Sequence, residues 1–234
     1  MMTQNIITID GPAGSGKSTI AKILARELGL KYIDTGAMYR ALTLIAIQNN
    51  IDCNDEKSIL EIARKTRIEL DNNSVDENKY TGIKLNGIDV TNEIRSSEVG
   101  AAVSIVSKLP GIRKYLVSLQ RELIKNGNAV LEGRDTGSVV CPDAILKIFL
   151  TASPEERIKR RELQVKNKGQ LLKREIIEKE IIERDRIDST RENSPLVIPE
   201  NAVVIDTTEL SIREVVDKIK KLYYERINGK NKTR

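Results

Sequence analysis

The chain carries a glycine-rich segment whose residue types and spacing are suited to holding a row of phosphate groups. Residues 11–18 match the P-loop pattern G-x-x-x-x-G-K-[ST]. Glycines allow the backbone to wrap closely around phosphates, and the N–H groups of the loop then point at the anion. Lys17 would reach the β- and γ-phosphates, while the hydroxyl of Ser18 would bind Mg²⁺. The predicted triphosphate-binding residues are Gly11, Pro12, Ala13, Gly14, Ser15, Gly16, Lys17, Ser18 and Thr19.

The segments on either side of this loop supply the context that a P-loop needs. Residues 6–9 form a β-branched run that predicts a buried strand, and residues 19–28 carry apolar side chains at helical spacing. The order of strand, glycine loop and helix is that of the P-loop motif. A glycine-rich turn that binds nothing is the alternative, and the matching strand and helix argue against it.

The chain has no histidine among its 234 residues. His-based acid–base catalysis, Ser-His-Asp triads and histidine metal sites are therefore excluded. Phosphoryl transfer needs none of these, because its catalysis rests on positioning and charge stabilisation. Lysine, arginine, carboxylates, backbone donors and a weakly held ion are sufficient for that reaction.

Charge and cysteine content indicate the kinds of partner and the location. The net charge is +5, but Lys and Arg alternate with Asp and Glu along the helical segments, which is typical of solvated faces. We therefore expect small anionic substrates and no nucleic acid polymer. Cys53 and Cys141 lie far apart in the sequence, which predicts free thiols and a cytoplasmic location. No apolar stretch approaches ~20 residues and no signal peptide is evident, so no membrane association is expected, and the polar helices favour a monomer.

Strands and helices alternate along most of the chain, which predicts an α/β fold of three α/β/α layers around a parallel sheet of five strands. The exception is residues 53–109, where three strand-like segments predict a small antiparallel sheet. The segments are residues 68–70, 80–85 and 88–91, and Asn86-Gly87 is a hairpin turn signal. The predicted domains are a core of residues 1–52 and 110–234, with a helical lid at about 154–173, and an insert of residues 53–109. Ligands are expected outside the carboxyl ends of the core strands.

Five strings of residues resemble those of the bacterial cytidylate kinases, which are nucleoside monophosphate (NMP) kinases of the P-loop class. Besides the P-loop, the strings are residues 34–40, 85–95, 133–137 and 183–191, and the resemblance extends from about residue 6 to residue 225. The long β-rich insert is the discriminating feature and is similar to the enlarged NMP-binding domain of that family. The resemblance implies transfer of the γ-phosphoryl group of ATP to CMP or dCMP, with Mg²⁺, in pyrimidine nucleotide metabolism.

The resemblance also implies which residues bind the acceptor nucleotide. The acceptor phosphate is mostly dianionic at neutral pH, so it needs no general base, but it does need guanidinium groups to hold it. Arg40, Arg134 and Arg191 are expected to do this, and a surface ion pair is the alternative for each. The full set of expected CMP-binding residues is Thr35, Tyr39, Arg40, Ser104, Arg113, Arg134, Asp135, Arg184, Asp188 and Arg191.

Base choice would lie with Ser104, Arg113 and Asp135. A carboxylate can accept a hydrogen bond from N4 of cytosine, and a guanidinium can donate to the ring acceptors. Uracil would place O4 against the carboxylate, so the buried groups would be badly paired. For Ser104 the alternative is an ordinary hydroxyl on a helix surface.

The sugar contacts are expected from Arg184 and Asp188. These residues are four apart, so they share one face if the charged helix of residues 173–186 continues that far. The resemblance implies that Asp188 accepts from a ribose hydroxyl. A simple i,i+4 ion pair is the alternative, and spacing alone does not decide between the two.

Several arginines of the predicted lid could place positive charge on the transferring phosphoryl group. Arg157, Arg160 and Arg161 are similar to lid arginines, although a solvated helix face explains each of them equally well. We select Arg157 and Arg161 as a pair. The predicted catalytic residues are Lys17, Arg134, Arg157 and Arg161, and Ser18 is the predicted metal ligand.

Two other functions remain possible from the sequence. One is a different P-loop small-molecule kinase, acting on AMP or a coenzyme precursor. The other is a regulatory protein that senses nucleotides without transferring phosphate. A comparison of monophosphate acceptors in a kinase assay separates all three.

Overall fold

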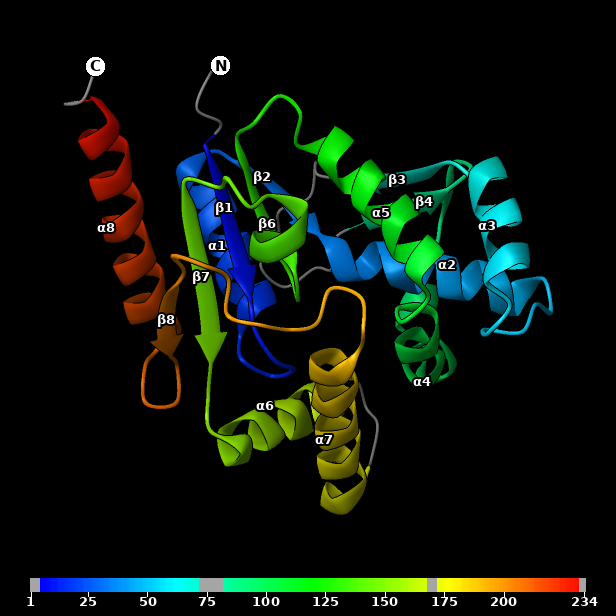
Figure 1. Ribbon diagram of the computed structural model, residues 1–234. Coiled ribbons are helices and arrows are strands. Elements are labelled where there is room, and N and C mark those ends of the chain that lie inside the picture. The colour runs from blue at the N-terminus through cyan, green and yellow to red at the C-terminus, as the bar shows by residue number, and fades with distance from the viewer. Residues whose placement is uncertain (1–4, 72–81, 168–171, 232–234) are drawn as a thin grey trace.

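The computed structural model describes residues 5–71, 82–167 and 172–231, and its centre is a five-stranded sheet (Figure 1). The strand order is β2-β6-β1-β7-β8, and each neighbouring pair runs parallel. This confirms the predicted α/β fold and the number of strands in its main sheet. The strands are β1 Ile6–Asp10, β2 Lys31–Asp34, β6 Ala129–Gly133, β7 Leu146–Thr151 and β8 Val203–Asp206.

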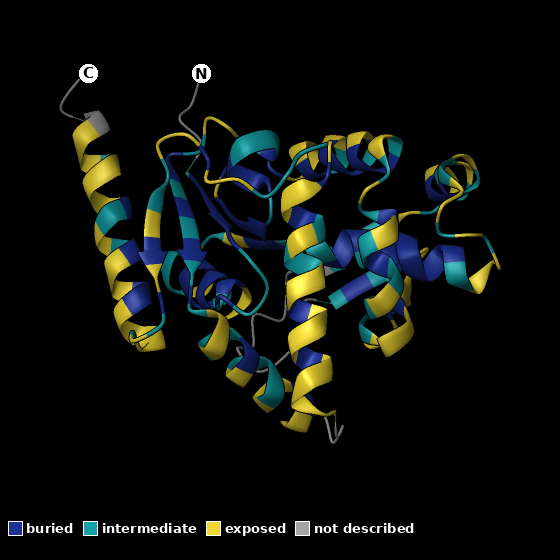
Figure 2. Cartoon of the chain, turned by 60° about the horizontal axis from the view of Figure 1, so that its bottom comes forward, coloured by how far each residue is buried: buried dark blue, intermediate teal, exposed yellow. Residues whose placement is uncertain are grey.

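Helices cover both faces of this sheet because its inner strands are apolar on both sides. Ile7 and Ile9 of β1 pack on one face with α1 (Lys17–Leu28) and α8 (Ile212–Asn231). Ile6 faces the other way, into a cluster that includes Val117 of α5 (Pro110–Leu123). Figure 2 shows the inner strands buried between helices whose outer faces are exposed. The result is the expected three-layer core.

The insert follows the predicted pattern, with small differences at its ends. β4 (Gly82–Leu85) pairs antiparallel with β3 (Ile68–Asp71) and with the short β5 (Ile88–Asp89). The hairpin turn signal is confirmed, because Asn86 and Gly87 both have positive φ angles, of 51° and 84°. Residues 80 and 81 of the predicted strand lie outside the described residues. Three helical segments complete this region: α3 Glu56–Lys65, η1 Glu93–Arg95 and α4 Ser97–Val106.

A helix of the core shares the hydrophobic cluster of the insert. α2 (Thr35–Gln48) begins where Asp34 accepts a hydrogen bond from the Ala37 N–H at 2.9 Å. Its apolar side chains, among them Leu42, pack in one cluster with Ile59 of α3 and Ile83 of β4. The insert is therefore built against α2 rather than held by its connecting segments alone (Figure 1).

Two charged helices lie beyond the carboxyl ends of the sheet strands, where a lid was expected (Figure 1). α6 (Pro154–Asn167) packs against α7 (Arg174–Thr190) through a small apolar cluster that includes Ile158 and Ile177. α7 continues to Thr190, beyond the predicted end at residue 186, so Arg184 and Asp188 do lie four apart on one helix. None of the helices that the structure describes is long and apolar enough to cross a membrane.

Candidate active site

The P-loop joins β1 to α1 and lies tightly against its neighbours. Gly11 has a φ of +149°, and a Cβ atom there would lie 2.0 Å from the carbonyl oxygen of Leu150 in β7. Gly14 has a φ of +76°, and a Cβ atom would meet the side chain of Arg157 at 2.9 Å. No other residue fits at either position, so Gly11 and Gly14 are required by packing as well as by phosphate approach.

Lys17 is buried at the start of α1 and folded back onto the loop. Its Nζ atom donates to the carbonyl of Pro12 at 2.6 Å and to Ser15 Oγ at 3.3 Å. Burial, and next to it the positive charge of Arg134, lower the pKa of Lys17 well below its usual value. An anion at this place would restore the balance of charge, which is the role expected of a P-loop lysine.

A buried carboxylate beside the P-loop was not among the predicted site residues. Glu132, near the end of β6, accepts from Ser18 Oγ at 2.8 Å through Oε2 and from the Tyr32 hydroxyl through Oε1. Burial raises the pKa of Glu132, and the nearby Asp34 raises it further. The sequence shows an acidic residue near the end of a predicted strand. That this residue lies next to Ser18 is seen only in the folded structure.

The turn that carries Arg134 and Asp135 is held in place by a second buried carboxylate. Asp10, at the end of β1, accepts from the N–H and hydroxyl of Thr136, each at 2.8 Å, and from the Gly137 N–H at 2.7 Å. These bonds hold the π-helical turn η2 (Thr136–Val140) against β1. Arg134 and Asp135 therefore stand on a rigid support directly beside the P-loop strand.

Three predicted arginines gather around Asp188 of α7. Arg134 Nε donates to Asp188 Oδ2 at 2.7 Å, and Arg191 Nη1 and Arg184 Nε lie 3.5 and 4.0 Å from its oxygens. Burial alone would raise the pKa of Asp188, but the three guanidinium groups bring it below its usual value. Burial and the charges of Arg134 and Arg40 lower the pKa of Arg184. One carboxylate thus faces three guanidinium groups, so the cluster keeps a net positive charge that a bound phosphate could neutralise.

Two of the three residues expected to read the base, Arg113 and Asp135, also meet. Arg113 of α5 forms a buried ion pair with Asp135, and Arg191 Nη2 lies 3.9 Å from the same carboxylate. The Tyr39 ring lies 5.2 Å from the guanidinium carbon of Arg113, and burial raises the pKa of Tyr39 to about 12. Ser104 is half-buried on α4.

Several donor atoms of this site are buried without an acceptor. The Tyr39 hydroxyl, Arg113 Nε and Arg191 Nη2 have no hydrogen-bond partner among the described residues. Buried polar atoms are nearly always paired, and each unpaired donor costs free energy. A polar ligand that supplied acceptors here would remove that cost.

Two other predicted residues lie between the P-loop and the insert. Arg40 Nη1 donates to the carbonyl of Ile94 at 3.3 Å, and burial lowers its pKa. Thr35 Oγ1 donates to the carbonyl of Glu132 at 2.7 Å. Both residues belong to α2, the helix that packs with the core and with the insert.

The three lid arginines have different surroundings. Arg157 donates to the P-loop carbonyl of Ala13 at 3.1 Å. Arg160 donates to the Oγ1 atom and to the carbonyl oxygen of Thr207, the residue that follows β8. Arg161 is 41% exposed, with Nη2 3.8 Å from a carboxylate oxygen of Glu180. Arg157 is thus in direct contact with the phosphate-binding loop, while the role of Arg161 stays a prediction.

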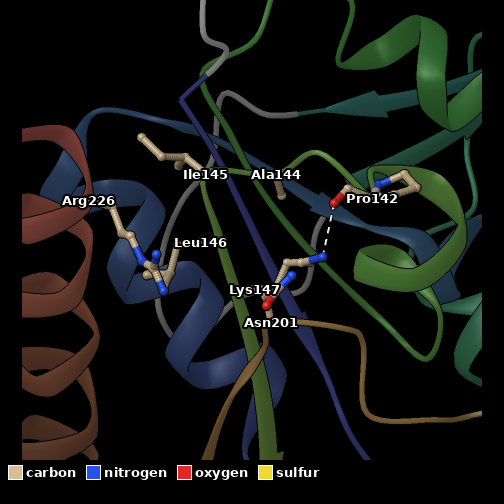
Figure 3. A pocket seen from close by; sticks show the side chains of 7 residues that line it. All are labelled: Pro142, Ala144, Ile145, Leu146, Lys147, Asn201 and Arg226. Atoms are coloured by element: carbon tan, nitrogen blue, oxygen red, sulfur yellow. Dashed lines mark hydrogen bonds between the residues drawn. The ribbon is translucent and has the colours of Figure 1, made fainter. Parts of the chain in front are cut away.

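A separate hollow of about 260 Å³ lies at the opposite end of the sheet, where β7 begins (Figure 3). It is lined at the amino end of β7 by Leu146 and Lys147, with Arg226 of α8 beside them. Lys147 Nζ donates to the carbonyl of Pro142 at 3.0 Å. The P-loop follows the carboxyl end of β1, so this hollow is not part of the site described above.

A P-loop with a cluster of buried arginines and the two charged helices α6 and α7 beside it is the arrangement of a P-loop kinase. The family model described as cytidylate kinase matches residues 7–225. The chain therefore belongs to the cytidylate kinase family, and its activity is the phosphorylation of CMP or dCMP by ATP. This confirms the first of the three predicted functions over the two alternatives.

Relatives with the same description cover nearly the full length. A cytidylate kinase of Caldanaerobacter subterraneus subsp. tengcongensis is 50% identical over 97% of this chain and 96% of its own. One of Geobacillus sp. is also 50% identical, over 97% of this chain and 100% of its own. A solved structure of an uncharacterized Eubacterium ventriosum protein has a TM-score of 0.50 at 13% identity, over 94% of this chain and 98% of that one. That likeness concerns the fold alone.

Proposed function

We propose that ATP and CMP bind on either side of Lys17 and Arg134. The observation that carries this is the position of Arg134. Its charge adds to burial in lowering the pKa of Lys17, and its own Nε atom donates to Asp188 of the arginine cluster. The P-loop and its lysine would hold the donor phosphates. Arg134 would then face the transferring phosphoryl group from the acceptor side, where it can stabilise the charge that develops.

We divide the acceptor residues into three groups by the part of CMP that each would contact. Arg40, Arg134 and Arg191 would hold the CMP phosphate, Arg184 and Asp188 the ribose, and Ser104, Arg113 and Asp135 the base. Thr35 and Tyr39 would line the same site from α2. The unpaired donors on Tyr39, Arg113 and Arg191 support this assignment, because a nucleotide supplies the missing acceptors.

Mg²⁺ fits the oxygen ligands beside the P-loop. Ser18 Oγ and Glu132 Oε2 lie 2.8 Å apart, and among the described residues no cluster of three or more acidic, cysteine or histidine residues could form a complete metal cage. Mg²⁺ usually takes few protein ligands and completes its shell with water and substrate phosphates. We propose that Ser18 binds the ion and that Glu132 acts beside it. The ion would neutralise charge on the donor phosphates.

Replacing Glu132 by glutamine should weaken the effect of Mg²⁺ on nucleotide binding. Glutamine keeps the size and an acceptor for Tyr32, but it removes the negative charge. We expect the ratio of ATP affinities with and without Mg²⁺, measured by calorimetric titration, to fall about tenfold. Glu27→Gln, at the far end of α1 and paired with Lys220 and Arg213, is the matched control. An unchanged ratio in Glu132→Gln would remove Glu132 from the metal site.

The acceptor range is tested by ADP release with CMP, dCMP, UMP and AMP. We expect kcat/KM for CMP and dCMP to exceed that for UMP and AMP, because Asp135 can accept from the cytosine amino group but not from a uracil oxygen. Equal kcat/KM values with CMP and UMP would contradict the base-reading role given to Asp135.

We further propose how the parts of the chain act together. The core of residues 1–52 and 110–234 would carry the donor site, the insert of residues 53–109 would close over CMP, and the lid at about 154–173 would close over ATP. α2 packs with the insert and would couple it to the core. We also propose a monomer in the cytoplasm, where the free thiols Cys53 and Cys141 are stable.

A further inference from the structure

A carboxylate of α7 joins the lid to the P-loop, and no role was expected for it. Asp185 Oδ1 accepts from the Ala13 N–H at 3.1 Å, and Oδ2 accepts from Arg157 Nη1. Arg157 Nη1 also donates to the carbonyl of Ala13 at 3.1 Å. The three residues therefore form a closed ring of hydrogen bonds in which both backbone groups of Ala13 are occupied.

This ring fixes the place of the Arg157 guanidinium. Its stem lies directly on the loop, because a Cβ atom on Gly14 would be only 2.9 Å from Arg157 Cβ. The Arg157 and Asp185 side chains are 12% and 22% exposed. Arg157 Nε is buried and has no hydrogen-bond partner among the described residues. A guanidinium carries five N–H donors, so Arg157 can keep Asp185 through Nη1 and still donate to a phosphoryl oxygen.

We propose that Asp185 is a positioning residue for phosphoryl transfer, holding Arg157 in the orientation in which it contacts the transferring group. The inference rests on the proposed role of Arg157 in the lid. A long arginine side chain has many rotamers, and a carboxylate that fixes one of them removes the cost of ordering it in the transition state. Asp185 contacts neither nucleotide in this role and acts through Arg157.

The position of Asp185 on α7 supports a role in the reaction rather than in folding. The same helix carries Arg184, one residue before Asp185, and Asp188, three residues after it. Both belong to the proposed acceptor site. Asp185 also acts on Arg134: burial lowers the pKa of Arg134, but the negative charges of Asp188 and Asp185 outweigh burial and raise it. α7 thus contacts the donor loop through one carboxylate and the acceptor arginines through another.

The test is a double-mutant cycle of Asp185→Asn and Arg157→Ala. Asparagine keeps the shape and one acceptor for Ala13, but it loses the charge that holds Arg157. We expect Asp185→Asn to lower kcat about 10- to 100-fold, with the KM of CMP unchanged. In the Arg157→Ala background the same substitution should cause no further loss, because its effect passes through Arg157. Asp217→Asn, in an exposed Asp–Arg pair of α8, is the matched control.

Each other outcome overturns the inference in a recognisable way. A normal kcat in Arg157→Ala would remove the role of Arg157 and with it that of Asp185. A low kcat in Arg157→Ala with a normal kcat in Asp185→Asn would leave the proposed function intact and overturn the inference alone. A higher kcat or tighter ATP binding in Asp185→Asn would make the carboxylate an obstacle to ATP. If the losses of kcat caused by the two substitutions add in full, Asp185 is a structural residue. If Asp185→Asn is unfolded at the assay temperature, Asp185→Ser replaces it in the same cycle and decides the case.

Discussion

Replacing Lys17 by alanine should lower kcat for CMP phosphorylation by about 10³-fold while the affinity for CMP stays unchanged. The lysine is the buried cation of the donor loop, and within the described part of the chain its Nζ atom has only neutral oxygens as hydrogen-bond partners, on Pro12 and Ser15. Its charge is therefore available to the β- and γ-phosphates. Because that charge follows the phosphoryl group as it moves, its loss is felt more strongly in the transition state than in the bound substrates.

The measurement separates turnover from acceptor binding. Single-turnover phosphorylation gives the rate of the chemical step, and calorimetric titration of CMP gives the acceptor affinity. Lys125→Ala, an exposed lysine of the segment after α5 that pairs with Glu122, is the matched control. If Lys17→Ala weakened CMP binding as much as it slowed transfer, Lys17 would belong to the acceptor site, and the division of the site between ATP and CMP would be wrong.

Local sequence patterns predicted several elements of the chain well, because each is decided by nearby residues. The P-loop, its strand and its helix follow from the matching residue types of the single stretch 6–28. The Asn86-Gly87 turn follows from two residues that tolerate positive φ. The start of α8 is equally local, since Ser211 and Glu214 cap it through each other.

Contacts between distant segments were not predictable in this way. Ser18 meets Glu132 only because β1 and β6 are neighbours in the sheet, with their carboxyl ends at one edge. The π-helical turn after Asp135 is held by Asp10, more than a hundred residues earlier. Asp185 reaches Ala13 only because α7 lies over the loop. In each case the residue type was visible in the sequence, but its partner was set by the fold.

The second large effect concerns the choice of base. Asp135→Asn should reduce the preference for CMP over UMP, measured as the ratio of kcat/KM values, by about 10²-fold or more. Asp135 lies buried against Arg113 and near Arg191, so its oxygens are fixed as acceptors. A carboxylate accepts from the cytosine amino group and repels a uracil oxygen. An amide can turn either its oxygen or its nitrogen toward the base, so it rejects neither.

A loss of stability would not imitate this result. Removing one charge of a buried ion pair costs about 3–5 kcal/mol in many proteins, so Asp135→Asn will unfold more readily. Unfolding lowers the rates with CMP and with UMP by the same factor, and their ratio is therefore unaffected. Asp143→Asn, an exposed aspartate at the opposite edge of the sheet, controls for the substitution itself. ATP affinity should be unchanged in both variants, because Asp135 faces the acceptor arginines. An unaltered CMP-to-UMP ratio in Asp135→Asn would show that selection of cytosine lies elsewhere, with Ser104 and Arg113 as the remaining residues to test.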